Sequence, residues 1–110
     1  MTAGPTLSTH VLDTERGQPA AGVPVELSQA GRSVARGLTD ADGRIGDLAA
    51  GPLTPGEYQI AFDVAAYFAA QGRDAPFLRR VTIEFLVSGG GHYHVPLLLA
   101  PYACTSYRGS

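Results

Sequence analysis

Residues 58–72 read YQIAFDVAAYFAAQG, and the spacing of their apolar residues changes midway. Up to residue 64, apolar side chains occupy every second position, which is the spacing of a strand with one face toward a core. Residues 64–71 are mostly good helix formers, and Gly72 follows them as a residue typical of a helix C-terminus. The stretch therefore predicts one strand that leads directly into one short helix.

The same alternation recurs on both sides of this stretch, between frequent turn residues. The chain contains 14 Gly and 8 Pro, and the segments between them are short. Such segments are typical of antiparallel sheets. Strands are expected at residues 6–13, 23–29, 32–39, 58–64, 81–87 and 92–99. The pattern predicts an all-β antiparallel sandwich of seven to eight strands with one short helix.

Two turns and one proline refine this prediction. Residues 30–31, Ala-Gly, suit a short hairpin connection. Residues 40–43, Asp-Ala-Asp-Gly, mark a tight turn, because Asp-Gly tolerates the positive φ that such turns require. Pro24 has no backbone N–H, so its strand is expected to be a sheet edge or to be unpaired at that residue.

Length, charge and cysteine content exclude several classes of protein. The 110 residues suit a single domain over residues 1–110. A net charge of −2 without a basic run gives no attraction to nucleic acid or acidic membranes. No apolar run approaches the roughly 20 residues of a membrane helix, and the first residues do not resemble a secretory signal. With one cysteine, Cys104, the expected compartment is the cytoplasm, and a buried structural thiol is expected.

The three histidines are the first candidates for chemistry. Alternation puts His10 on the face of its strand opposite the apolar set, and it puts His92 and His94 opposite the apolar set of the last strand. The outer face of that last strand also carries Pro96 and Leu98. An apolar outer face argues for burial against another subunit.

Two generic sites can be built from these histidines. The His-x-His spacing of His92 and His94, with His10, would allow a three-histidine zinc site with one open position. No acidic residue adjoins the pair to orient its rings, so a metal is not predicted. A Ser/His/Asp triad would lack the usual Gly-x-Ser-x-Gly turn. Its candidate serines are Ser8, Ser106 and Ser110.

Arg44 and the end of the chain carry little information by themselves. Arg44 directly follows the Asp-Gly turn, and residues 107–110 read Tyr-Arg-Gly-Ser. Taken alone, the first is a surface arginine and the second a frayed tail. The residues alone therefore indicate a β-sandwich with outward histidines and stop short of a reaction.

Several blocks resemble the transthyretin-like proteins. The blocks at the start are LSTHVLDT at 7–14, GQPA at 17–20, VPVEL at 23–27 and DGR at 42–44. Residues 93–99, YHVPLLL, and residues 107–110, YRGS, resemble the signature of the 5-hydroxyisourate hydrolases within that family. The resemblance extends from residue 7 to residue 110.

The resemblance implies a homotetramer, a dimer of dimers, with active sites in the channel between the dimers. It implies hydrolysis of 5-hydroxyisourate to 2-oxo-4-hydroxy-4-carboxy-5-ureidoimidazoline in urate breakdown, without metal or organic cofactor. One histidine would be the base for water, and an arginine would stabilise the developing negative charge. The family's catalytic positions fall on His10, Arg44, His94 and Ser110, and its substrate-binding positions on Tyr107, Arg108 and Gly109. His92 has no position in this set.

Two other functions remain open. A transthyretin-type binding protein would share the fold and the channel without catalysis, although the Tyr-Arg-Gly-Ser ending favours the hydrolases. A structural or adhesion sandwich would be a monomer with His10 and His94 exposed. Residues 103–104, Ala-Cys, replace the Gly-Tyr that is common in the family, which affects how the tail packs.

Overall fold

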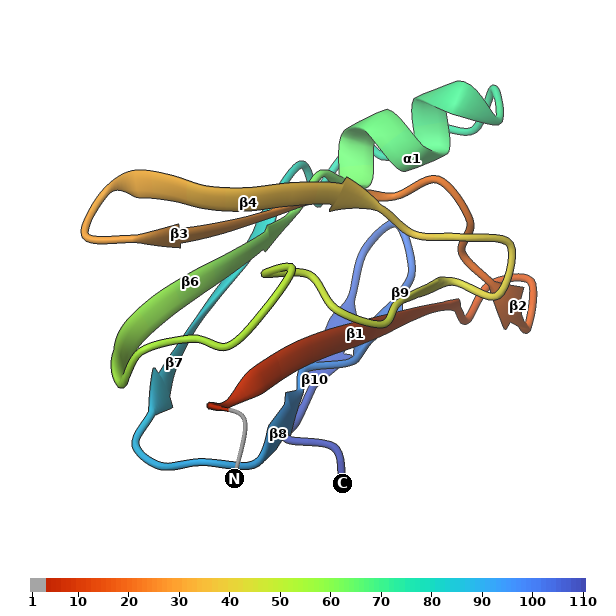
Figure 1. The fold of residues 1–110 in the computed structure, drawn as a ribbon. Coiled ribbons are helices and arrows are strands. Elements are labelled where there is room, and N and C mark those ends of the chain that lie inside the picture. Colours follow the sequence, from red (N-terminus) through yellow and green to blue (C-terminus); the bar gives the residue numbers. More distant parts are fainter. Residues whose placement is uncertain (1–3) are drawn as a thin grey trace.

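A computed structural model describes residues 4–110, and its strands form two sheets packed face to face (Figure 1). One sheet contains β1 (Thr6–Asp13), β2 (Gln18–Pro19), β5 (Arg44–Ile45), β8 (His92–His94), β9 (Leu97–Leu99) and β10 (Cys104–Ser106). The other contains β3 (Pro24–Gln29), β4 (Arg32–Leu38), β6 (Gly56–Phe62) and β7 (Val81–Val87). With one short helix, α1 (Val64–Ala70), the predicted all-β sandwich is confirmed. The described residues form ten strands instead of the expected seven to eight, and two of the pairings in the first sheet are parallel. The predicted domain of residues 1–110 includes three residues outside the described part.

The core lies between the two sheets and takes side chains from both. The inward positions expected from alternation are buried, among them Leu7, Val11, Ile60, Phe62, Leu97 and Leu99. Full burial of such a side chain stabilises the fold by about 1.5–3 kcal/mol. The alternation of the sequence therefore decides which face of each strand remains for a functional site.

Strand β1 is paired along both of its edges. The Leu48 amide donates to the Leu7 carbonyl and the Val95 amide to the Ser8 carbonyl, and consecutive carbonyls of a strand point to opposite edges. β2 and β5 pair with β1 in antiparallel orientation, whereas β8 and β9 pair with it in parallel. The parallel pairs join the two ends of the chain, which no hairpin connects.

The strand expected at residues 92–99 is divided into β8 and β9 at Val95 and Pro96. The Thr9 hydroxyl donates to the Val95 carbonyl at 2.6 Å, and the Ser106 hydroxyl donates to the Pro96 carbonyl at 2.8 Å. Pro96 is buried within the chain itself. This part of the outer face therefore needs no partner subunit to cover it.

Strand β3 is an interior strand between β4 and β6, so the first alternative for Pro24, an edge strand, is wrong. Pro24 is paired with Leu38 of β4 but has no partner in β6. Pro24 is the first residue of β3, and the pairing with β6 begins one residue later, at Val25 and Phe62. The Pro24 carbonyl accepts a hydrogen bond from the Asp63 amide at 2.9 Å. The missing N–H thus falls at a strand end, where the sheet tolerates it.

The thiol of Cys104 is exposed, so the expected buried thiol is wrong. Cys104 is the first residue of β10, which pairs only with β9 among the described strands. An edge strand has no neighbour on its second side to cover a side chain at its end.

Helix α1 begins and ends as the sequence predicts. The Asp63 carboxylate caps it by accepting from the Ala66 amide at 3.0 Å. Gly72 has φ +66°, and the Gly72 and Arg73 amides donate to Ala69 and Phe68 carbonyls in a glycine-terminated C-cap. Figure 1 shows α1 at the end of the sandwich away from the C-terminal residue. Among residues 4–110, no helix is long and apolar enough to cross a membrane.

A buried carboxylate, that of Asp13, ties the end of β1 to α1 and the loop after it. It accepts hydrogen bonds from the Tyr67 hydroxyl at 2.8 Å and from the Arg73 guanidinium at 2.6 Å. Burial raises the pKa of Asp13, but the hydrogen bonds from Arg73 and Tyr67 outweigh it and hold the pKa below its usual value. The carboxylate is therefore charged in the folded protein at neutral pH.

We expect Asp13→Asn to lower the free energy of unfolding by about 3 kcal/mol, because it removes one member of a buried ion pair. The folded state lowers the pKa of Asp13, so its contribution is complete above the unfolded value of about 3.9 and is lost as the pH falls through the folded value. Urea unfolding of the wild type and of Asp13→Asn, at neutral pH and at about pH 3, measures the difference in the free energy of unfolding between them. If this difference in stability does not become smaller in acid, the charge of Asp13 is not what stabilises the fold.

Candidate active site

The turn at residues 40–43 fixes where Arg44 enters the sheet. The Asp40 carboxylate accepts hydrogen bonds from the Asp42 and Arg44 amides at 2.9 and 3.0 Å. Gly43 has φ +75°, its carbonyl accepts from the Val11 amide at 2.7 Å, and a Cβ at Gly43 would overlap the Val11 carbonyl oxygen. Only glycine allows the turn to approach β1 this closely. The approach pairs Arg44 with His10 across the β5–β1 ladder.

The sheet register brings four distant segments side by side. β1 pairs His10 with Arg44 on one edge and Ser8 with His94 on the other. His94 in turn pairs with Gly109, whose amide donates to the His94 carbonyl at 2.8 Å. Figure 1 shows the C-terminal segment running beside β8. The tail is therefore part of the sheet at this point and not frayed.

A hollow of about 310 Å³ opens over this row of segments. Its lining includes Ser8, Arg44, Gly46, His92, His94 and Ser110. Of the predicted catalytic residues, Arg44, His94 and Ser110 thus share one hollow. His10 is half-buried beside it and does not line it.

The remaining tail residues lie elsewhere. A Cβ at Gly109 would overlap the His94 ring, so Gly109 lies directly against that imidazole. Tyr107 and Arg108 border a separate hollow, and the Arg108 guanidinium stacks on the Tyr93 ring at 4.4 Å. Such a cation–π contact holds the tail to β8. Tyr107 and Arg108 are therefore not brought to the hollow of His94 in this chain.

The electrostatic surroundings of His94 keep its imidazole neutral. Burial lowers the pKa of His94, and unfavourable electrostatic interactions with His92, Arg44 and His10 lower it further. Its Nδ1 lies 2.7 Å from the Ser8 hydroxyl, and its Nε2 has no hydrogen-bond partner among residues 4–110. No buried side-chain nitrogen or oxygen in that range lacks a partner, so Nε2 is accessible. His94 thus offers an open nitrogen that can accept a proton.

Two residues without a predicted role in the resemblance, Ser8 and His92, join His94. The Ser8 hydroxyl lies 2.6 Å from His92 Nε2, and Thr6 Oγ1 lies 2.7 Å from His92 Nδ1. Among residues 4–110, no hydrogen bond joins a carboxylate to His92 or His94, so Ser8 and His94 lack the Asp of a triad. Within the same range, no group of three His, Cys, Asp or Glu is arranged to hold a metal. The period-two pattern puts Ser8 on the outer face, but only the β1–β8 register shows what it contacts.

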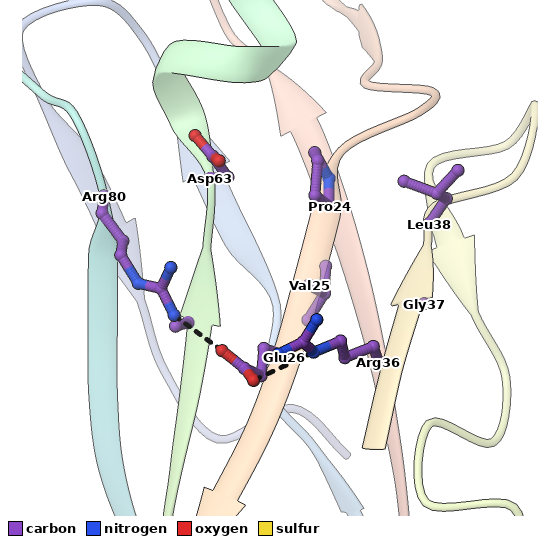
Figure 2. Close-up of a pocket in the computed structure, with 9 residues that line it drawn as sticks. Pro24, Val25, Glu26, Arg36, Gly37, Leu38, Asp63 and Arg80 are labelled. Atoms are coloured by element: carbon purple, nitrogen blue, oxygen red, sulfur yellow. Dashed lines mark hydrogen bonds and ion pairs between the residues drawn. The ribbon is translucent and has the colours of Figure 1, made fainter. Parts of the chain in front are cut away.

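The outer face of the second sheet carries a different hollow, shown in Figure 2. There the Glu26 carboxylate accepts from Arg36 at 3.1 Å and from Arg80 at 2.9 Å. Both guanidinium groups are thus paired with one carboxylate, and no histidine lines the hollow. No imidazole lines this hollow, so the histidine cluster around His94 has no counterpart on this face.

Comparisons with known proteins agree with this architecture. The model of the HIUase/transthyretin family matches residues 7–109. The 5-hydroxyisourate hydrolase of Deinococcus radiodurans is 44% identical over 119 residues, covering 100% of both chains. The structure of Klebsiella pneumoniae 5-hydroxyisourate hydrolase has a TM-score of 0.89 at 45% identity, covering 96% of this chain and 99% of that one.

A carrier shares the same fold. The structure of sea bream transthyretin in complex with thyroxine has a TM-score of 0.83 at 32% identity and covers 94% of each chain. The fold therefore does not by itself separate the two activities. Because the family model spans residues 7–109 and these relatives align over nearly their full lengths, this chain belongs to the HIUase/transthyretin family.

Proposed function

We propose that this chain hydrolyses 5-hydroxyisourate to 2-oxo-4-hydroxy-4-carboxy-5-ureidoimidazoline, a step of urate breakdown. The observation that carries the proposal is the hollow that Arg44, Ser110 and a neutral His94 line together, with His94 Nε2 free of a hydrogen-bond partner among residues 4–110. The two relatives at 44 and 45% identity, each named 5-hydroxyisourate hydrolase, support it.

The reaction opens the six-membered ring of the substrate by breaking one acyl–nitrogen bond. His94 Nε2 accepts a proton from water as the water oxygen adds to the acyl carbon. Arg44 donates hydrogen bonds to the oxyanion that forms there, and the nitrogen leaves with a proton returned by His94. The Ser110 hydroxyl positions the substrate or the water.

The second candidate function is binding without catalysis, as in the complex of sea bream transthyretin with thyroxine. The lining of the His94 hollow favours hydrolysis, because sites for small apolar ligands are mainly apolar with few polar groups. Here Arg44, His92 and His94 line one small hollow together. The identity to the hydrolases also exceeds the 32% identity to that carrier.

We also propose that the chain works as a homotetramer, a dimer of dimers, in the cytoplasm. Leu86 and Tyr107 border the hollow beside β7 and are 59% and 58% exposed, which is unusual for large apolar side chains without a partner. A single cysteine that forms no intrachain disulfide suits a reducing compartment. Light scattering should give four times the chain mass of 11.5 kDa. A mass of one chain would overturn the assembly.

The activity is tested by following 5-hydroxyisourate, generated from urate by urate oxidase, as its absorbance decays. The protein at micromolar concentration should accelerate the decay well above the spontaneous rate, and a chelator should leave that rate unchanged. No acceleration would favour the carrier function. Loss of activity with chelator and recovery with added zinc would instead revive the three-histidine metal site.

Replacement of Gly109 by alanine tests the contact between the tail and His94. The new Cβ would overlap the imidazole ring, so we expect kcat/KM to fall by about 10²-fold, as for displacement of a reacting group by about 1 Å. Gly90→Ala is the matched control, because its Cβ would meet nothing within 4 Å. Equal activity of the two variants would mean that the tail does not position His94.

A further inference from the structure

Four side chains of β1 and β8 form one continuous chain of hydrogen bonds. Thr6 Oγ1 contacts His92 Nδ1 at 2.7 Å, His92 Nε2 contacts Ser8 Oγ at 2.6 Å, and Ser8 Oγ contacts His94 Nδ1 at 2.7 Å. The parallel register produces it, because Thr6 lies opposite His92 and Ser8 opposite His94. The chain begins at an exposed hydrogen bond between Thr6 and His92 and ends at the imidazole that lines the hollow.

The number of protons in this chain allows only two arrangements when both imidazoles are neutral. A serine hydroxyl has one proton, so Ser8 donates to one imidazole and accepts from the other. If Ser8 donates to His92, His94 must carry its proton on Nδ1, and its Nε2 has a free lone pair. If Ser8 donates to His94, the proton of His94 is on Nε2, which is then a donor. The direction of the chain therefore decides whether His94 is a base or an acid.

We infer that Ser8 and His92, with Thr6 at the outer end, form a proton relay that sets which nitrogen of His94 carries the proton. The inference rests on the proposed hydrolysis for its use in the reaction, and on the contacts above for its existence. Ser8, His92 and Thr6 are positioning residues, because both ring nitrogens of His92 are engaged in the chain and only His94 keeps an open nitrogen, Nε2, among residues 4–110. Their effect on the reaction passes through the His94 imidazole.

The relay moves a proton without creating a buried charge. As His94 Nε2 takes a proton from water, its Nδ1 proton passes to Ser8 Oγ, and the Ser8 proton passes to His92 Nε2. The Nδ1 proton of His92 passes to Thr6 Oγ1, whose own proton leaves to solvent. Each group gains one proton and loses one. The reversed chain leaves Nε2–H on His94, which can protonate the leaving nitrogen.

The surroundings of His94 favour such a neutral transfer over a charged imidazolium. His94 is half-buried, and it faces His10 from β1, Arg44 from β5, His92 from its own strand and Ser110 from the tail. A second positive charge in this cluster would be repelled by the guanidinium of Arg44. Shifting the proton outward through neutral groups avoids that repulsion.

The kinetic test compares Ser8→Ala, His92→Phe and the double variant. Each single change interrupts the same relay, so each should lower kcat about tenfold. This is the lower end of the range for residues that orient a catalytic ligand. KM should stay unchanged within about twofold. The double variant should be no slower than either single variant, because a relay can be broken only once. Ser8→Thr keeps a hydroxyl at this position, so its kcat should equal that of the wild type and not that of Ser8→Ala. If the losses in kcat of the two single variants multiply in the double variant, the relay is wrong.

Thr14→Ala is the matched control for Ser8→Ala. The Thr14 hydroxyl donates to the Leu99 carbonyl at 3.1 Å, so this variant also loses one hydroxyl bond across the first sheet but touches no histidine. We expect its kcat to equal that of the wild type. A tenfold loss in Thr14→Ala as well would assign the Ser8 effect to general weakening of the sheet.

The ¹⁵N resonances of the His94 ring test the relay without substrate. They should report the proton on Nδ1 in the wild type and its transfer to Nε2 in Ser8→Ala and in His92→Phe. Unchanged resonances in both variants would overturn the inference. If the wild type fails to accelerate hydroxyisourate decay while the resonances still shift together, the proposed function fails and the relay stands.

Discussion

His94→Asn should lower kcat/KM for 5-hydroxyisourate by about 10²- to 10⁴-fold, the range for loss of a positioned general acid–base group. Asparagine keeps a polar group of similar reach near Ser8, but it cannot accept a proton from water at neutral pH. The free energy of unfolding should change little, because His94 is only half-buried. Steady-state decay assays and urea unfolding measure the two quantities separately.

The pH dependence of the wild type gives this prediction a second readout. Because burial and nearby positive charges lower the pKa of His94, its neutral form persists below the usual value of about 6.5. The acid limb of kcat/KM should therefore lie below that value, with activity lost as the pH falls through it. A limb above about 6.5 would show that a different group is the base.

Arg44→Ala should lower kcat/KM by about 10²- to 10³-fold, which corresponds to roughly 3–4 kcal/mol for loss of an oxyanion donor. Arg44→Lys should regain only part of the lost kcat/KM, since a single ammonium cannot reproduce the planar, bidentate guanidinium. The loss should fall mainly on kcat, because the negative charge that Arg44 meets develops in the transition state. An effect confined to KM would make Arg44 a binding residue only.

Arg44→Ala should also move the acid limb toward higher pH. The guanidinium is one of the positive charges that lower the pKa of His94, so its removal raises that pKa toward the ordinary value. Arg36→Ala is the matched control, because Arg36 lies on the outer face of the second sheet, paired with Glu26 (Figure 2). We expect Arg36→Ala to change neither rate nor pH profile.

The longer strands, the helix and the buried faces could be predicted from the sequence because they depend on local spacing, whereas the short strands β2, β5 and β10 were not expected. Alternation alone assigns Leu7 and Val11 to the core and His10 to the outer face. The interior position of β3 could not be predicted, because Pro24 indicates only that one N–H is missing and not which strands flank β3. The parallel pairing of β1 with β8 depends on contacts between the two ends of the chain, which no local pattern contains.

The candidate site also contains residues that could be predicted from the sequence and residues that could not. Arg44, His94 and Ser110 were predicted from a family resemblance, and the structure brings them into one hollow. Ser8 and His92 gained no role from the resemblance, because their contacts with each other and with His94 follow from the strand register. An outward serine facing an outward histidine can be recognised only once the pairing of their strands is known.

The proposed reaction requires that a urate-derived ring is held between Arg44, His94 and Ser110. A crystal structure of the protein with urate, a stable planar relative of the substrate, tests it most directly. Urate should bind in the hollow of His94, with ring carbonyls on the Arg44 guanidinium. Urate bound only beside Tyr107 and Arg108, or only on the face with Glu26, would contradict it.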